Sequence, residues 1–196
     1  QPVNVYGSSK FIAERIFTNF DYNSQTTIFA SVRYGNVIAS RGSFIPLWMD
    51  KARNNQEITI TSFECSRFMF TLENAVDTVL DSLQAAQGGE VFIPKIKSYN
   101  LRTVLEAVES IMDISPLITT LVGMRPGEKI HEDMLAETEL PFTYEVSKDL
   151  MVVLPQYTRK NHKFNKKYIG PRYNSSLHLD CDTESLKRMI LKGLEQ

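Results

Sequence analysis

Residues 27–43 read TIFASVRYGNVIASRGS, an apolar run followed at once by a polar turn. The run over 27–32 reads as a buried strand. It ends in the polar segment 33–36, which Gly35 interrupts. Asn36 therefore stands at a predicted strand end, where parallel sheets usually place ligand-binding residues, and its amide both donates and accepts hydrogen bonds.

Helices and strands alternate on both sides of this segment. Apolar side chains recur at helical spacing after the predicted caps Ser8, Ser9 and Thr71. The predicted helices cover 8–20, 43–53, 71–87, 100–112, 127–137 and 182–194. The predicted strands cover 27–32, 57–61, 90–94, 118–122 and 150–154, and residues 156–176 are expected to form loop. Strands separated by helices favour an α/β fold with parallel pairing.

The composition is that of an ordinary globular protein, because 42% of its 196 residues are hydrophobic and 23% are charged. Lysine and arginine (22) balance aspartate and glutamate (23), and a net charge of −1 does not favour nucleic acid or an anionic membrane as partner. The basic run 159–167 is expected to be a solvated loop. The longest apolar stretches are far too short to span a bilayer, and no signal peptide is expected.

The cysteines and histidines form no recognisable pattern. Cys65 and Cys181 are too few for a disulfide framework and indicate a reducing cytosol. The histidines share no ligand spacing, so no metal is expected; they are His131, His162 and His178. We expect His131 to lie on a helix surface rather than to act as a base.

Tyr6 and Lys10 are four residues apart, which is one helical turn and the same face. This pair suits proton transfer to or from a sugar or alcohol hydroxyl. A free tyrosine has a pKa of about 10 and is a poor base, but a nearby cation favours its phenolate. The spacing alone leaves open a plainer reading, a tyrosine at a helix start beside a solvated lysine.

The order and spacing of several motifs carry a family resemblance. The segments are YGSSK (6–10), VRYGNVIASRGS (32–43), CSRFMFTL (65–72), EVFIPKI (90–96) and GMRPGEKIHE (123–132). Together they resemble the inverting UDP-N-acetylglucosamine 4,6-dehydratases, which are extended short-chain dehydrogenase/reductases of the polysaccharide biosynthesis protein family. Two positions depart from that pattern, since Ser66 replaces the usual threonine and Lys97 replaces a usual proline.

The resemblance implies a fold and a division of the chain. The fold would be the later part of an NAD(P)-binding Rossmann fold followed by a small C-terminal α/β substrate-binding domain. The Rossmann part would comprise 1–40, with 71–100 returning to it. The substrate-binding region would comprise 41–70 and 101–196.

The resemblance also implies residue roles. Tyr6 and Lys10 would be catalytic and would contact the cofactor, expected to be NADP. The nicotinamide side would be lined by Val37, Ile38, Ala39, Ser40 and Arg41. The sugar nucleotide would be bound by Asn36, Phe44, Thr61, Arg67, Arg125 and Glu128. Arginine suits this task because its guanidinium pairs with phosphate oxygens through two parallel hydrogen bonds. Each of these assignments has a plainer alternative. Arg125 and Glu128 could form a surface ion pair, Phe44 could be a core residue, and Thr61 could be a simple strand residue.

The implied reaction is a lyase-type dehydration of UDP-N-acetylglucosamine with inversion at C5. It would yield a 4-keto-6-deoxy-L-sugar nucleotide for surface glycans, in a cytoplasmic homo-oligomer that binds a UDP-sugar. The long apolar helices over 8–20 and 71–87 are candidate contact faces between subunits.

Part of the expected machinery is missing from the sequence. Its nine glycines form no GxGxxG, the phosphate-binding turn that opens such a fold. The family's Asp-Lys pair, used at C5 and C6, stands upstream of the tyrosine, so we expect this chain to be a C-terminal portion. The alternatives are a 4-epimerase, a C5-retaining 4,6-dehydratase, or a truncated, non-catalytic module for sugar-nucleotide binding or oligomerisation.

Overall fold

The computed structural model describes residues 2–195 as two compact units. Unit 1 comprises residues 2–34, 76–96 and 133–174, and unit 2 comprises 35–75, 97–132 and 175–195. The predicted division into a cofactor-binding and a substrate-binding region stays a prediction, because compactness assigns no ligand to either unit.

Unit 1 is built around a five-stranded sheet of order β1-β5-β10-β9-β11. Its strands are β1 (Ser31–Val32), β5 (Val91–Pro94), β9 (Thr143–Glu145), β10 (Leu150–Val153) and β11 (Lys166–Lys167). Only β1 and β5 pair in parallel, and the other neighbours are antiparallel. Parallel pairing was expected throughout, so this sheet is mixed. The connection of residues 146–149 between β9 and β10 is too short for a crossover helix, so these two strands pair antiparallel.

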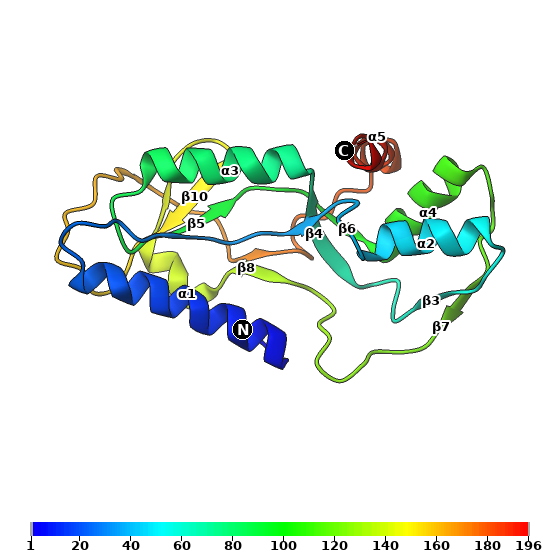
Figure 1. Ribbon diagram of the computed structural model, residues 1–196, viewed down its shortest axis with the longest axis horizontal. Coiled ribbons are helices and arrows are strands. Elements are labelled where there is room, and N and C mark those ends of the chain that lie inside the picture. The colour runs from blue at the N-terminus through cyan, green and yellow to red at the C-terminus, as the bar shows by residue number, and fades with distance from the viewer. Residues whose placement is uncertain (1, 196) are drawn as a thin grey trace. The chain divides into compact units, whose positions relative to one another are not determined.

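Helices flank this sheet, and its central strands form the core of the unit. Figure 1 shows helices α1 (Val5–Asn23) and α3 (Leu72–Ala85) on either side of β5 and β10. Every residue of β5 and of β10 is buried, as expected for strands covered on both faces. Phe92, Leu150 and Val152 form one cluster at the centre. Strands β8 (Asp133–Leu135) and β12 (Tyr173–Asn174) form a separate antiparallel pair, and a 3-10 helix covers Glu137–Phe142.

Unit 2 contains two small sheets and three helices. One sheet has the order β2-β4-β6, from β2 (Asn36–Val37), β4 (Ser66–Phe70) and β6 (Ser98–Asn100). The other pairs β3 (Ile58–Ile60) with β7 (Thr119–Leu121) in parallel. The helices are α2 (Phe44–Arg53), α4 (Leu101–Met112) and α5 (Thr183–Leu194), and their apolar faces meet in a core that contains Trp48, Tyr99 and Leu186.

Most predicted helices are confirmed within one or two residues, and their caps explain why. The Asn100 side chain accepts a hydrogen bond from the Thr103 N–H at 2.8 Å and begins α4. Thr71 does the same for Asn74 at the start of α3. The predicted α/β class is confirmed at this level.

The start of the first helix was predicted three residues too late. The helix begins at Val5, because the Asn4 side chain accepts the Gly7 N–H at 2.7 Å. Ser8, predicted as a cap, instead donates its hydroxyl to the Asn4 carbonyl at 2.9 Å. The helix also continues through Asp21, where loop was expected.

The predicted helix over 127–137 is wrong. Gly127, at its predicted start, has φ +83°, outside the helical range, and strand β8 begins at Asp133 within the predicted span. The carbonyls of Lys129 and Ile130 accept hydrogen bonds from the Arg67 guanidinium at 3.0 and 3.1 Å, rather than from helical N–H groups. A long-range side-chain contact therefore replaces the local pattern.

Candidate functional site

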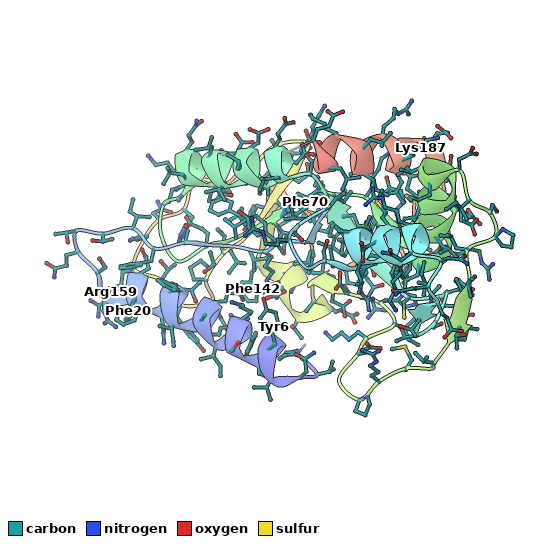
Figure 2. All side chains as sticks on the ribbon, turned by 45° about the vertical axis from the view of Figure 1, so that its right-hand side comes forward. Tyr6, Phe20, Phe70, Phe142, Arg159 and Lys187 are labelled. Carbon is teal, nitrogen blue, oxygen red and sulfur yellow. The ribbon has the colours of Figure 1, made fainter. Side chains whose placement is uncertain are left out.

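The predicted catalytic pair lies on the first turns of α1, in unit 1. Tyr6 is 72% exposed, and Lys10 is also exposed. The Lys10 Nζ atom lies 5.1 Å from the centroid of the Tyr6 ring, so the helix does bring the two side chains together. Figure 2 shows Tyr6 near the start of α1 and Phe20 near its end. An exposed phenol with an adjacent ammonium is able to exchange a proton with a ligand hydroxyl.

Five predicted ligand-binding residues surround one small cavity in unit 2. The cavity has a volume of about 50 Å³ and is lined by Asn36, Val37, Ile38, Ser40, Ser43, Phe44, Ile45 and Met69. Asn36 pairs with Met69 across the parallel strands β2 and β4. A space of this size accepts a small polar group of a ligand rather than a whole ring.

The chain makes a tight turn beside this cavity. Ala39 has φ +58°, a left-handed conformation that is uncommon for a residue other than glycine. The Ser40 N–H donates to the Val37 carbonyl at 3.3 Å, and the Ser43 N–H donates to the Ser40 carbonyl at 2.9 Å. Backbone strain of this kind concentrates at ligand-binding segments, where the surrounding structure must hold it in place.

Ser43 is a cavity residue that sequence reasoning missed. It is the N-cap of α2, yet its side chain makes no capping bond, and its Oγ is buried without a hydrogen-bond partner among residues 2–195. A buried hydroxyl in that state is unusual and suits a polar ligand atom. Its place between the predicted residues Arg41 and Phe44 is the only signal in the sequence. Phe44 itself packs edge-on against Trp48, with ring centroids 5.1 Å apart.

Arg67 contacts the segment that follows residue 125. Its guanidinium donates to the carbonyls of Ser66 at 2.8 Å, of Lys129 and of Ile130. Its Nε lies 3.6 Å from the Glu132 carboxylate, whose pKa is raised because burial outweighs the neighbouring cations. Arg67 therefore fixes the course of this segment.

Arg125 and Glu128 occupy a turn in the same segment. The Glu128 carboxylate accepts the Arg125 backbone N–H at 3.2 Å, and the Arg125 side chain is exposed. This arrangement leaves the guanidinium directed to solvent, where it is accessible to an anion. Thr61 is linked to this segment through Cys65. The Thr61 Oγ1 lies 3.9 Å from the Cys65 Sγ, and that sulfur lies 3.5 Å from the Sδ of Met124, the residue before Arg125.

His131 was expected on a helix surface, but the structure does not place it on a helix. It is half-buried, and its Nδ1 is 2.7 Å from the Ser66 Oγ. The Ser66 Oγ is also 2.6 Å from the Ser175 Oγ, which accepts the Glu132 N–H at 2.8 Å. This buried chain of hydrogen bonds ties the segment around Glu132 to β4, so its role is structural.

The structure thus distributes the predicted residues between the units. Tyr6 and Lys10 belong to unit 1, and the predicted substrate residues all belong to unit 2. Among residues 2–195, no three His, Cys, Asp or Glu side chains gather closely enough to hold a metal ion. None of the helices described for these residues has the length and apolar character needed to cross a membrane.

Comparison with known proteins gives the family. The model described as "Polysaccharide biosynthesis protein" matches residues 1–155. An inverting UDP-N-acetylglucosamine 4,6-dehydratase of Campylobacter jejuni is 37% identical over 149 residues, which are 74% of this chain and 42% of that protein. A UDP-glucose 4-epimerase of Rickettsia bellii is 33% identical and covers 100% of this chain and 57% of its own length. An uncharacterized membrane protein of Methanocaldococcus jannaschii is 34% identical over 96% of this chain and 57% of its own. This chain spans about half the length of these relatives.

Solved structures agree on the fold. The protein Pen from Bacillus thuringiensis superposes with a TM-score of 0.84 at 32% identity, over 98% of this chain and 59% of its own. A UDP-glucose 4-epimerase of Thermus thermophilus, solved with NAD, superposes with a TM-score of 0.56 at 19% identity, over 65% of this chain and 44% of its own, and shows the fold alone. The neighbours are Rossmann-type α/β enzymes, which confirms the predicted fold class. The chain belongs to the polysaccharide biosynthesis protein family of extended short-chain dehydrogenase/reductases.

Proposed function

We propose that the protein catalyses NADP-dependent 4,6-dehydration of UDP-N-acetylglucosamine with inversion at C5. The observation that carries this proposal is the Tyr6–Lys10 pair on one helical turn, with Lys10 Nζ 5.1 Å from the tyrosine ring. Its weight comes from relatives with 36% and 37% identity that are named for this reaction. The net change is the loss of one water from the sugar, so the enzyme is a lyase.

The residues present fit the redox end of a nicotinamide dinucleotide. Lys10 presents an exposed ammonium with donors for ribose hydroxyls. The turn over 37–41, strained at Ala39, would line the nicotinamide side. A nicotinamide cofactor bound there would supply hydride transfer, from C4 of the sugar and back to C6. NADP rather than NAD is part of the proposal.

Tyr6 and Lys10 supply the proton transfer of the first step. The Tyr6 phenolate takes the proton of the C4 hydroxyl while that carbon is oxidised to a ketone. The Lys10 ammonium, 5.1 Å from the centroid of the Tyr6 ring, places a positive charge beside this proposed base. The new ketone acidifies the C5–H bond, which prepares loss of the C6 hydroxyl as water.

Unit 2 supplies the residues proposed for the sugar nucleotide. Arg125 is exposed and suits a diphosphate oxygen, and Glu128 on the same turn accepts from ribose or uracil donors. Arg67 holds that turn through the carbonyls of 129 and 130, and we keep it as a second candidate for phosphate. Asn36 lines the cavity beside Ser43. Phe44 and Thr61 complete the proposed contacts.

A second candidate function is 4-epimerisation. It is favoured by the Rickettsia bellii relative, which matches 100% of this chain and is named a UDP-glucose 4-epimerase. Both reactions begin with oxidation at C4, so the Tyr–Lys pair serves either. They differ in the product, because epimerisation retains the C6 hydroxyl.

Assembly and location also remain proposals. Large apolar side chains of α1 and α3 are exposed, among them Phe17 at 50% and Leu83 at 72%. Such helix faces support the predicted homo-oligomer. Sedimentation of the full-length protein tests the assembly, and a monomer at micromolar concentration contradicts it. A cytoplasmic location stays a prediction.

The experiment uses the full-length protein with UDP-N-acetylglucosamine and NADP⁺. We expect a dehydrated 4-keto product by mass spectrometry and an L-configured sugar by NMR. Tyr6→Phe should lower kcat by about 10²- to 10⁴-fold, the usual contribution of a positioned acid or base. Tyr22→Phe, near the other end of the same helix, is the control and should leave kcat unchanged.

Each other result decides against the proposal. A product that retains its mass indicates an epimerase, and a D-configured 4-keto product indicates a retaining dehydratase. UDP binding without turnover indicates a binding module. Full activity of Tyr6→Phe excludes Tyr6 as the catalytic base.

A further inference from the structure

Helix α1 is held to unit 1 by polar contacts and by ring contacts of Phe17 and Phe20 with Phe29. Of its residues only Asp21 is buried, whereas Phe11, Ile12, Ile16 and Phe17 are 44–56% exposed. The second polar anchor is Glu14, whose side chain is only 12% exposed. Because the ring contacts and Asp21 lie in the second half of the helix, Glu14 is the anchor that lies nearest its first turns.

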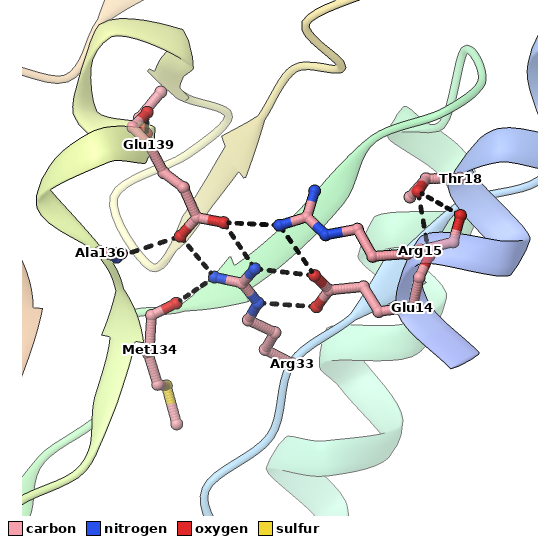
Figure 3. Close-up of polar contacts among 8 residues, drawn as sticks. Glu14, Arg15, Thr18, Arg33, Met134, Ala136 and Glu139 are labelled. Carbon is pink, nitrogen blue, oxygen red and sulfur yellow. Dashed lines mark hydrogen bonds and ion pairs between the residues drawn. The ribbon is translucent and has the colours of Figure 1, made fainter. Parts of the chain in front are cut away.

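The Glu14 anchor is the guanidinium of Arg33, directly after β1. Arg33 Nε and Nη2 donate to the two Glu14 carboxylate oxygens at 2.7 and 2.8 Å. On its other side, Arg33 Nη1 and Nη2 donate to the two Glu139 oxygens at 2.8 and 2.7 Å. Nη1 also donates to the Met134 carbonyl at 2.7 Å (Figure 3). Every N–H of the guanidinium is used, so none is left for a substrate.

This cluster joins α1 to two other parts of unit 1. The Arg33 N–H donates to the Phe92 carbonyl at 2.9 Å, which fixes its backbone to β5. The Glu139 carboxylate accepts the Ala136 N–H at 3.0 Å, which fixes it to the chain after β8. Arg15, 3.5 Å from Glu139, adds a second cation, so two cations face two carboxylates.

The charges in the cluster are strongly coupled. Burial opposes the charge of Arg33, but its hydrogen bonds with Glu14 and Glu139 outweigh burial and raise its pKa. Burial would raise the pKa of Glu139, yet Arg33 lowers it. Arg33 and Glu139 therefore stay charged, and removal of one member of the cluster leaves buried charge uncompensated.

Glu14 follows Lys10 by one helical turn and Tyr6 by two. Side chains four residues apart lie on neighbouring positions of one helix face, so a displacement of Glu14 displaces Lys10 and Tyr6 with it. We infer that Arg33 is a positioning residue: through Glu14 it sets the place of α1, and hence of the Tyr6–Lys10 pair. The expected loss of kcat rests on the proposed function, whereas the expected displacement of α1 does not.

The test compares Arg33→Gln with Val152→Ala in the full-length protein. Val152 is buried in β10 and lies outside the cluster, so this control lowers stability in the same unit without touching α1. Misplaced catalytic groups cost up to about 10²-fold, and we expect kcat of Arg33→Gln to fall about 10- to 100-fold beyond any unfolded fraction. KM for the UDP-sugar should change by less than about twofold, because the lost interaction is not with substrate. Arg33→Lys should recover only part of kcat, since an ammonium cannot bridge both carboxylates bidentately.

Two further measurements complete the test. If Arg33 acts through Glu14, Glu14→Gln combined with Arg33→Gln should lower kcat no further than Arg33→Gln alone, within about twofold. Hydrogen exchange of the amides over 8–17 should be faster in Arg33→Gln than in Val152→Ala, and this readout needs no activity. If the protein has no turnover, the proposed function fails while hydrogen exchange still decides the inference. Unchanged exchange, additive effects on kcat, or a raised KM with normal kcat overturns it.

Discussion

Gly88 occupies a position where a single methyl group should be costly. Its φ is +126°, far from the values that other residues adopt, and it lies at the turn between α3 and β5. A Cβ atom here would overlap the Asp21 carboxylate and the Lys160 ammonium. Asp21 is 3% exposed and accepts hydrogen bonds from the Phe29 N–H at 3.0 Å and from Lys160 at 2.7 Å.

The size of the effect follows from these contacts. Strained backbone at such a φ costs about 1–3 kcal/mol. Lys160 is able to swing away, but Asp21 is buried, so its displacement leaves a buried group unsatisfied at about 1–3 kcal/mol. Gly88→Ala should therefore lower the free energy of unfolding by about 2–6 kcal/mol, against a total of about 5–15 kcal/mol for a typical domain.

Gly123 provides a matched control. It also has positive φ, at +78°, but a Cβ there would meet no atom within 4 Å among the residues described. Gly123→Ala should thus cost only the backbone strain, about 1–2 kcal/mol. Urea unfolding of both variants in the full-length protein measures the difference, provided the m-values agree. Equal losses of free energy in the two variants would refute the reasoning, because the Asp21 contact would then have no cost.

Three further predictions concern the remaining features. The hydrogen bond with Glu90 raises the pKa of His162 in the folded protein. Protonated His162 therefore stabilises the fold fully below its unfolded pKa of about 6.5, and this stabilisation is lost as pH rises through the raised folded pKa. Thermal unfolding of wild type and His162→Gln as a function of pH measures the contribution. Asn100→Ala removes the cap of α4 and should lower the free energy of unfolding by about 0.5–2 kcal/mol. Ser43→Ala, at the start of α2, should change it by less than about 0.5 kcal/mol. Urea unfolding measures both. Arg125→Gln should weaken UDP binding by about 10- to 100-fold in calorimetry, and Arg125→Lys should restore only part of it.

Each of these has a contradicting result. A stability advantage of wild type over His162→Gln that grows above neutral pH would reverse the sign of the His162 contribution. Equal losses for Asn100→Ala and Ser43→Ala would mean that the Ser43 hydroxyl does cap its helix. Unchanged UDP affinity in Arg125→Gln would remove Arg125 from the proposed site.

The sequence was a good guide wherever local chemistry decides the structure. Helix α4 is an example, because Asn100 caps it and its apolar residues recur at helical spacing, so both signals lie within a few residues. The family resemblance was equally local, since its motifs are short and contiguous. The pairing of Asn36 with Met69 was not accessible, because strand register depends on residues far apart in the chain.

The helix wrongly predicted over 127–137 fails because a distant partner overrides a local pattern, whereas the late predicted start of α1 was a missed local cap, Asn4. Residues 127–137 have helical composition, yet Arg67 takes the carbonyls of Lys129 and Ile130. The contacts of Arg33 likewise depend on residues that are distant in the chain. Within the motif at 32–43 it reads as one more polar residue after a strand, and only the approach of Glu14 and Glu139 shows what it does.

The division of residues between the units bears on why relatives of this chain carry two kinds of name. Arg125 and Glu128 in unit 2 would bind the nucleotide part of the substrate, which is the same in a dehydratase and an epimerase. Tyr6 and Lys10 in unit 1 would act at C4, where both reactions begin with the same oxidation. Interactions that are equal in ground state and transition state determine KM, and those made only in the transition state determine kcat. Neither Arg125 and Glu128 nor Tyr6 and Lys10 would distinguish what happens next to the 4-keto sugar. The chain is 37% identical to an inverting dehydratase over 149 residues and 33% identical to an epimerase over 197 residues, so identity does not separate the two reactions either. Choice between the two reactions must therefore come from groups that reach C5 and C6, and product analysis rather than binding is the measurement that separates them.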